Sequence, residues 1–97
     1  MPIPVQAFQT PTIGGVSYAN LSASALVKTG EGFLTGVFVA STTGGTLKLW
    51  DNTTAVAPIL TNTITFTAAG WYPMPFHFNT GLYATIGGTL DCTLSFT

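Results

Sequence analysis

The stretch GTLDCTLSF, residues 88–96, decides the fold class of this chain. Its apolar residues occupy every second position: Leu90, Cys92, Leu94 and Phe96. Because successive side chains of a β-strand point to opposite faces, this period of two predicts a strand with one buried and one exposed face. Cys92, the only cysteine, falls in the apolar phase, so we expect it to be a small core residue.

Other runs along the chain follow the same period. NTITFT (62–67) directs Ile64 and Phe66 to one face, and TLKLW (46–50) alternates in the same way. In GFLTGVFVAS (32–41) both faces carry apolar residues: Phe33, Val37 and Val39 on one, Leu34 and Phe38 on the other. Such a strand lies at the centre of a sheet, or its outer face meets another subunit.

Turn-forming residues separate these runs at short intervals, and no window shows the apolar spacing of a helix. We therefore expect an all-β protein, a compact antiparallel β-sandwich of jelly-roll type with seven or eight strands. The expected strands cover 5–9, 16–28, 32–41, 45–51, 59–67, 71–78, 82–86 and 88–96. We expect residues 1–15 to form an extended N-terminal arm and residues 16–97 a single β-sandwich domain. The expected core contains Phe33, Val37, Ile64, Phe66, Leu90, Leu94 and Phe96.

Charge is scarce. Only 5% of the chain is charged and the formal net charge is -1, whereas an ordinary soluble domain carries about 25% charged residues. A surface with so little charge favours a subunit of a larger assembly. One His, one Cys and three carboxylates leave few groups for chemistry, so we expect no enzyme activity, no cofactor and no metal site. The sequence has no basic stripe of the kind that binds nucleic acid. It also has no apolar run of about 18 residues, the length that a membrane span requires.

The N-terminal arm is the first candidate for contact with a partner. Pro2 and Pro4 favour an extended conformation, while Ile3, Val5 and Phe8 supply apolar anchors. Such an arm could lie across a neighbouring subunit and add a strand to it. The alternative is a frayed end followed by an ordinary first strand.

The run WYPMPFHF (71–78) is the second candidate. Its two prolines exclude a regular central strand, so we expect an edge strand or a bulge. Alternation assigns four residues to the core: Tyr72, Met74, Phe76 and Phe78. Trp71 and His77 then lie at the surface or in an interface. A sugar-stacking platform built on Trp71, Tyr72 or Trp50 is a minor alternative, and three copies of His77 around a threefold axis could hold a metal only in a symmetric oligomer.

The run GGTLKLWDNTT (44–54) ends in a turn in which Asp51 and Asn52 can bond their own backbone. It is either an exposed recognition loop or a hairpin whose Trp50 packs on a sheet face, and we favour the hairpin.

Four phrases of the sequence carry a resemblance to a known group: TGEGFLTGVFVAS, GTLKLWDN, AAGWYPMPF and FNTGLYATIGGTLDCTLSF. They resemble the small Thr- and Gly-rich β proteins of the virions of tailed bacteriophages and cyanophages. The resemblance implies a jelly-roll-like capsid decoration or cement protein that sits as trimers on the outer surface of the capsid, or else a tail or fibre component. It carries no catalytic residues.

These observations together predict a non-enzymatic phage virion protein, a homo-oligomer with a trimer preferred, that stabilises the shell by bridging subunits of the major capsid protein. The alternative is a tail or fibre component that binds host-surface glycans through exposed aromatic residues. Neither nucleic acid nor membrane is an expected partner. The residues expected at the interface are Pro2, Ile3, Pro4, Val5, Phe8, Leu34, Phe38, Trp50, Trp71 and His77.

Overall fold

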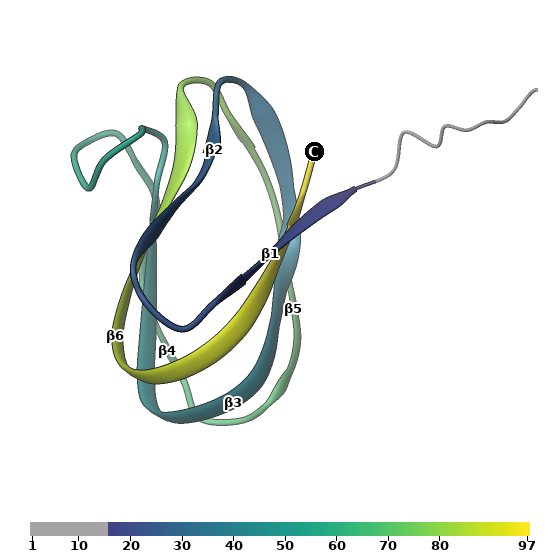
Figure 1. Cartoon of the computed structure of the whole chain (residues 1–97), viewed down its shortest axis with the longest axis vertical. Coiled ribbons are helices and arrows are strands. Elements are labelled where there is room, and N and C mark those ends of the chain that lie inside the picture. The colour runs from purple at the N-terminus through teal and green to yellow at the C-terminus, as the bar shows by residue number, and fades with distance from the viewer. Residues whose placement is uncertain (1–15) are drawn as a thin grey trace, which may run out of the picture.

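The computed structural model describes residues 16–97, so the expected arm and the strand over 5–9 lie outside it. Within this range the chain is all-β, as expected, and has no helix (Figure 1). Its six strands form one antiparallel sheet. They are β1 (Ser17–Leu21), β2 (Ala25–Thr29), β3 (Gly32–Trp50), β4 (Ile59–Phe66), β5 (Gly70–Phe78) and β6 (Gly81–Phe96).

The two long strands, β3 and β6, form the centre of the sheet. They pair with each other along nearly their whole length. The first part of β3 also pairs with β5 and its last part with β4, while the first part of β6 pairs with β2 and its last part with β1. The sheet thus has two four-stranded halves. We call them the β1 half, in the order β1-β6-β3-β5, and the β2 half, in the order β2-β6-β3-β4.

Glycines mark the boundary between the two halves. The β3–β6 register shifts between Thr43 and Thr46, and Gly44 and Gly88 there have φ angles of +61° and +66°. A Cβ on Gly88 would lie 2.3 Å from the carbonyl oxygen of Gly44. Only glycine allows both this backbone conformation and this approach. Figure 1 shows β3 and β6 curving together at the lower end of the molecule.

The bend explains why the structure has fewer strands than expected. The sequence predicts breaks between 32–41 and 45–51 and between 82–86 and 88–96, and both breaks fall in this glycine region. There the chain curves without losing its strand pairing, so each expected pair is one continuous strand. The expected strand 16–28, in contrast, is divided into β1 and β2 by residues 22–24.

A single apolar cluster contains buried side chains from both halves. Of the expected core residues, the structure buries Val37, Phe66, Leu90, Leu94 and Phe96, together with Cys92. Ile64 is only half-buried and packs against the cluster.

The expected placement of Phe33 is wrong: it is 39% exposed, whereas Leu34 is completely buried. The cause is an irregularity at Thr35, which the pairing of β3 skips on both sides, toward β5 and toward β6. One extra residue reverses the in–out alternation. The Thr35 hydroxyl donates a hydrogen bond to the Ser95 carbonyl at 2.8 Å. Alternation read backward from Val37 therefore assigns Phe33 and Leu34 to the wrong faces.

The run 71–78 is the expected edge strand with a bulge. Within the described part of the chain β5 pairs only with β3, and the register shifts where Gly36 pairs with Pro73 and Leu34 with Phe76. Met74 and Phe78 are buried as expected and Tyr72 is half-buried, but Phe76 is 43% exposed. No second neighbouring strand covers Phe76, because β5 lies at the sheet edge.

Candidate interaction surface

The outer face of the β1 half carries four exposed aromatic side chains. Tyr18 is 72% exposed, Trp71 51%, Phe38 47% and Phe33 39%. Their register places them on the same face: Phe38 pairs with Trp71, and Tyr18 pairs with Ser95, which lies between the buried Leu94 and Phe96. We call these four residues the aromatic face. Exposed apolar groups this close together are typical of a contact surface.

Glycine positions the largest member of this face. A Cβ on Gly36 would lie 2.6 Å from Cη2 of Trp71 and 2.7 Å from its Cζ2. The indole therefore occupies the space that a side chain at position 36 would take, and it covers Gly36, which is buried. Trp71 lies against the sheet on one side and keeps its other side open to a partner.

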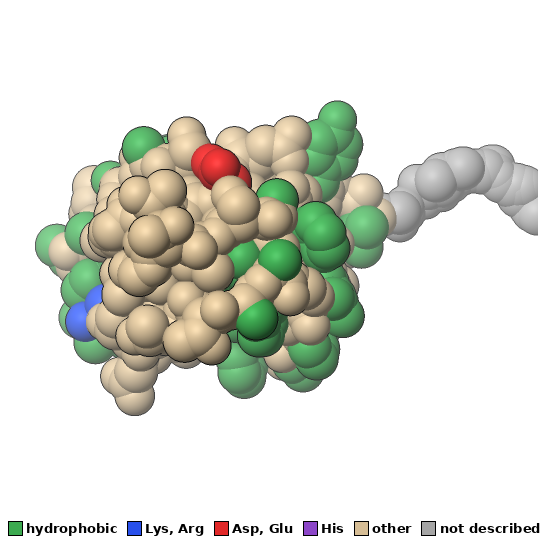
Figure 2. Space-filling model, turned by 90° about the horizontal axis from the view of Figure 1, so that it is seen from below, with side chains coloured by type: hydrophobic (Ala, Val, Ile, Leu, Met, Phe, Trp, Pro, Cys, Tyr) green, Lys and Arg blue, Asp and Glu red, His purple; other side chains and the backbone are tan. Residues whose placement is uncertain are grey.

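Charged side chains are few at the bend end of the molecule. Seen from the bend, most of the surface is uncharged and polar, with isolated acidic and basic side chains (Figure 2). Hydrophobic side chains gather on the right of that view, which is the side where Figure 1 shows β1 and β5. Because only 5% of the chain is charged, a partner would meet few charges whose desolvation opposes binding.

His77 lies on the same outer face, because it pairs with Phe33 across β3 and β5. Its Nε2 is 2.7 Å from Oε2 of Glu31, and both side chains are at least half exposed. Among the residues that the structure describes, no three potential metal ligands cluster. Within one chain His77 is the partner of a surface carboxylate.

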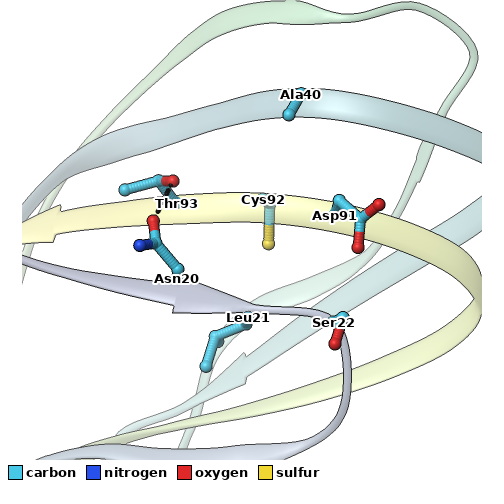
Figure 3. Close-up of a pocket in the computed structure, with 7 residues that line it drawn as sticks. All are labelled: Asn20, Leu21, Ser22, Ala40, Asp91, Cys92 and Thr93. Carbon is cyan, nitrogen blue, oxygen red and sulfur yellow. Dashed lines mark hydrogen bonds between the residues drawn. The ribbon is translucent and has the colours of Figure 1, made fainter.

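A shallow open pocket of about 320 Å³ lies beside β1 (Figure 3). The Thr93 hydroxyl donates to Oδ1 of Asn20 at 2.6 Å, and the Ser41 hydroxyl donates to Oδ2 of Asp91 at 2.9 Å. Burial, and secondarily the Asp91 charge, raise the pKa of the Cys92 thiol to about 11. The thiol is protonated at neutral pH and is not an activated nucleophile. The lining residues are Asn20, Leu21, Ser22, Ala40, Asp91, Cys92 and Thr93.

Trp50 belongs to the β2 half and is half-buried. Its Nε1 donates to Oγ1 of Thr85 at 2.9 Å, and the Lys48 ammonium lies 4.5 Å from the ring centroid. The side chain is thus packed on a sheet face, which is the hairpin interpretation of this run. With a cation over its ring, Trp50 is a poor platform for a sugar.

The sequence predicts that Asp51 bonds its own turn, but the Asp51 carboxylate instead caps the turn between β5 and β6. Its Oδ1 accepts from the backbone N–H groups of Thr80 at 2.8 Å, Asn79 at 2.9 Å and Gly81 at 3.5 Å. Burial raises the pKa of this carboxyl. The three N–H groups and nearby His77 lower it by more than burial raises it, so the pKa of Asp51 lies below its ordinary value. Asn52 does bond its own turn, accepting from Thr53 N–H at 2.8 Å.

The expected interface residues fall into three groups. Phe38, Trp71 and His77 are exposed on one face. The expected interface position of Leu34 is wrong, because its side chain is buried in the core. Trp50 is partly buried and lies in the β2 half of the sheet. The arm residues Pro2, Ile3, Pro4, Val5 and Phe8 lie outside the described residues.

Two members of the aromatic face, Tyr18 and Phe33, were not expected at an interface. Tyr18 alternates with the half-buried Ala19 and Leu21, so an aromatic side chain at a polar-phase position was a usable signal. Phe33 had no such signal, because the irregularity at Thr35 is not visible in the sequence.

No helix within residues 16–97 has the length and the apolar character needed to cross a membrane. Comparison of the chain with protein-family models, curated proteins and solved structures finds no match.

Proposed function

We propose that this protein is a non-enzymatic virion protein that decorates the outer surface of a phage capsid and holds neighbouring major capsid subunits together. The observation that carries the proposal is the aromatic face, four exposed aromatic side chains on a chain in which only 5% of the residues are charged. The virion setting rests on the sequence resemblance. A jelly-roll-like sandwich, assembled as a homotrimer, is the form that we propose for the decorating unit.

The physical basis of such a function is mass action. A protein that binds the assembled shell but not its separated subunits stabilises the shell by its binding free energy. Several contacts from one oligomer strengthen the effect, because the first contact raises the effective concentration of the others. Apolar contacts suit this task, since they remain strong at the salt concentrations that screen surface charges.

The second candidate is a tail or fibre component that binds host glycans. The open side of the Trp71 indole favours it, because aromatic rings with a free face stack on sugars. The two candidates differ in where the protein sits: a lattice of many copies on the shell supports the capsid role, whereas a few copies at the tail support adhesion.

The test compares variants of the aromatic face with a variant elsewhere. Trp71→Ser and Phe38→Ser should lower occupancy on virions stripped of the protein and lower the temperature at which the particles release their DNA. Leu26→Ser is the matched control, because Leu26 is similarly exposed (45%) but belongs to the β2 half. Equal occupancy and heat resistance for all three variants would refute a capsid role for this face.

A further inference from the structure

Four strands lie at the edges of the bent sheet. Within residues 16–97, β1 and β2 each pair only with β6, and β4 and β5 each pair only with β3. A free edge presents unpaired backbone N–H and C=O groups to any chain that can pair with them. Proteins protect such edges with prolines, charged side chains and bulges, so the four edges can be compared by these devices.

Three of the four edges are protected. β5 contains Pro73 and Pro75 and a register shift. β2 contains Lys28 and a register shift next to it. β4 has two register shifts against β3, on either side of Leu49. Each of these features interrupts the regular array of backbone groups that an added strand requires.

The edge of β1 has none of these devices. Its five residues pair with β6 without a break, from Ser17 opposite Phe96 to Leu21 opposite Cys92. It contains no proline and no charged residue, and Tyr18 is the most exposed member of the aromatic face. Among the edges of the described sheet, β1 is therefore the one suited to accept another strand.

The arm supplies a segment of matching length. Residues 5–10, VQAFQT, are bounded by Pro4 and Pro11 and contain no proline themselves. Proline has no N–H to donate, so pairing through this run stops at both ends. Six residues match the five of β1, and the side chains alternate, with Val5 and Ala7 on one face and Phe8 on the other.

We propose that residues 5–10 of one copy pair with the free edge of β1 in a second copy of this chain. The connection from Thr10 to Val16 spans up to about 20 Å when extended, enough to cross to an adjacent copy. Tyr18 on β1 belongs to the aromatic face, so a second copy that delivers its arm to β1 lies at the border of that face, whereas a strand folded back from the same chain brings no neighbour there. Around a threefold axis, each arm would serve the next copy and the ring would close.

The exchange rests on the proposed self-association of the chain but not on a capsid, so it is tested on the free protein. The full chain and a chain lacking residues 1–9 are compared by sedimentation and by hydrogen exchange. The full chain should be an oligomer, and the deleted chain a folded monomer. On deletion, the β1 amides that point away from β6 should exchange about tenfold faster or more, while the amides of β3 and β6 keep their protection.

A pair of point variants tests the edge itself. Tyr18→Lys places a charge on β1 and should dissociate the oligomer, because a lysine at a strand edge opposes strand addition. Thr63→Lys places the same charge at an exposed position of β4 and should leave the oligomer intact. If both variants stay assembled, or if both dissociate, β1 is not the acceptor.

A peptide spanning residues 2–10, added to the deleted chain, should restore slow exchange at the outward amides of β1. Protection that appears at another strand would overturn the proposal. So would a full chain that is monomeric yet protected at β1, because its own arm would then occupy the edge. An oligomer of unchanged mass and unchanged β1 exchange after deletion would overturn it as well.

Discussion

The capping of the β5–β6 turn by Asp51 predicts a defined dependence of stability on pH. Asp51→Asn keeps the size of the side chain but removes its charge and turns one acceptor oxygen into a donor. The carboxylate accepts charge-assisted hydrogen bonds from the N–H groups of Asn79 and Thr80 at 2.8–3.0 Å. Hydrogen bonds to charged groups contribute about 1.5 to 3 kcal/mol each, and their loss leaves donors unsatisfied, so we expect the variant to lose about 2 to 3 kcal/mol of unfolding free energy at pH 7.

The pH dependence follows from the lowered pKa of Asp51. A carboxyl whose pKa is lower in the folded than in the unfolded state stabilises the fold above the unfolded value of about 4. This stabilisation is lost as the pH falls through the folded pKa. The difference in stability between the natural chain and Asp51→Asn should therefore be largest above pH 5 and should shrink below pH 4, while the other carboxyls titrate in both proteins and cancel.

The assay is urea unfolding at equal protein concentration, followed by tryptophan fluorescence between pH 2 and pH 7. Asp91→Asn is the control, because Asp91 is exposed and, among residues 16–97, its carboxylate accepts only from the Ser41 hydroxyl. This control should change the unfolding free energy by about 1 kcal/mol or less. The reasoning is refuted if Asp51→Asn unfolds at the same urea concentration as the natural chain at pH 7, or if their difference stays constant down to pH 2.

Two further predictions concern the bend and the core. Gly88→Ala should prevent stable folding, because its Cβ would lie 2.3 Å from the Gly44 carbonyl oxygen; Gly44→Ala has a similar φ but open space, so it should cost only about 1 to 2 kcal/mol. Comparable thermal midpoints for the two variants would show that the close approach is not what requires glycine. Phe66→Ala should cost about 3 to 5 kcal/mol, because the ring is buried and lies 4.7 Å from that of Tyr72. Phe33→Ala should cost about 1 kcal/mol or less, since the side chain is partly exposed, and a larger loss in chemical denaturation would contradict the register described for β3.

The class of the fold, most of the core and the edge character of β5 were predictable from the sequence. Each depends on a local property of the chain. Alternation with a period of two determines which face of residues 88–96 is buried, whatever the strand pairs with. Pro73 and Pro75 cannot complete a backbone ladder in a central strand, so they confine their strand to an edge in any antiparallel sheet.

The surface was predictable only in part. Phe38, Trp71 and His77 were expected to be accessible because they alternate with buried neighbours. Phe33 and Leu34 were exchanged, because the irregularity at Thr35 reverses the alternation and arises from how β3 fits β5 and β6. Which strand carries an irregularity is a property of pairing partners, and those partners lie far away in the sequence.

Residue type and local spacing are enough to make this chain a β protein with little charge, few reactive groups and an edge strand marked by prolines. The long-range packing of the chain makes β3 and β6 run unbroken through their glycines, since Gly44 and Gly88 must meet before the bend exists. The same long-range packing sets the role of Asp51, whose hydrogen-bond partners are 28 to 30 residues away in the sequence. Such contacts depend on how the two halves of the sheet pack together, and a local sequence pattern does not predict that packing.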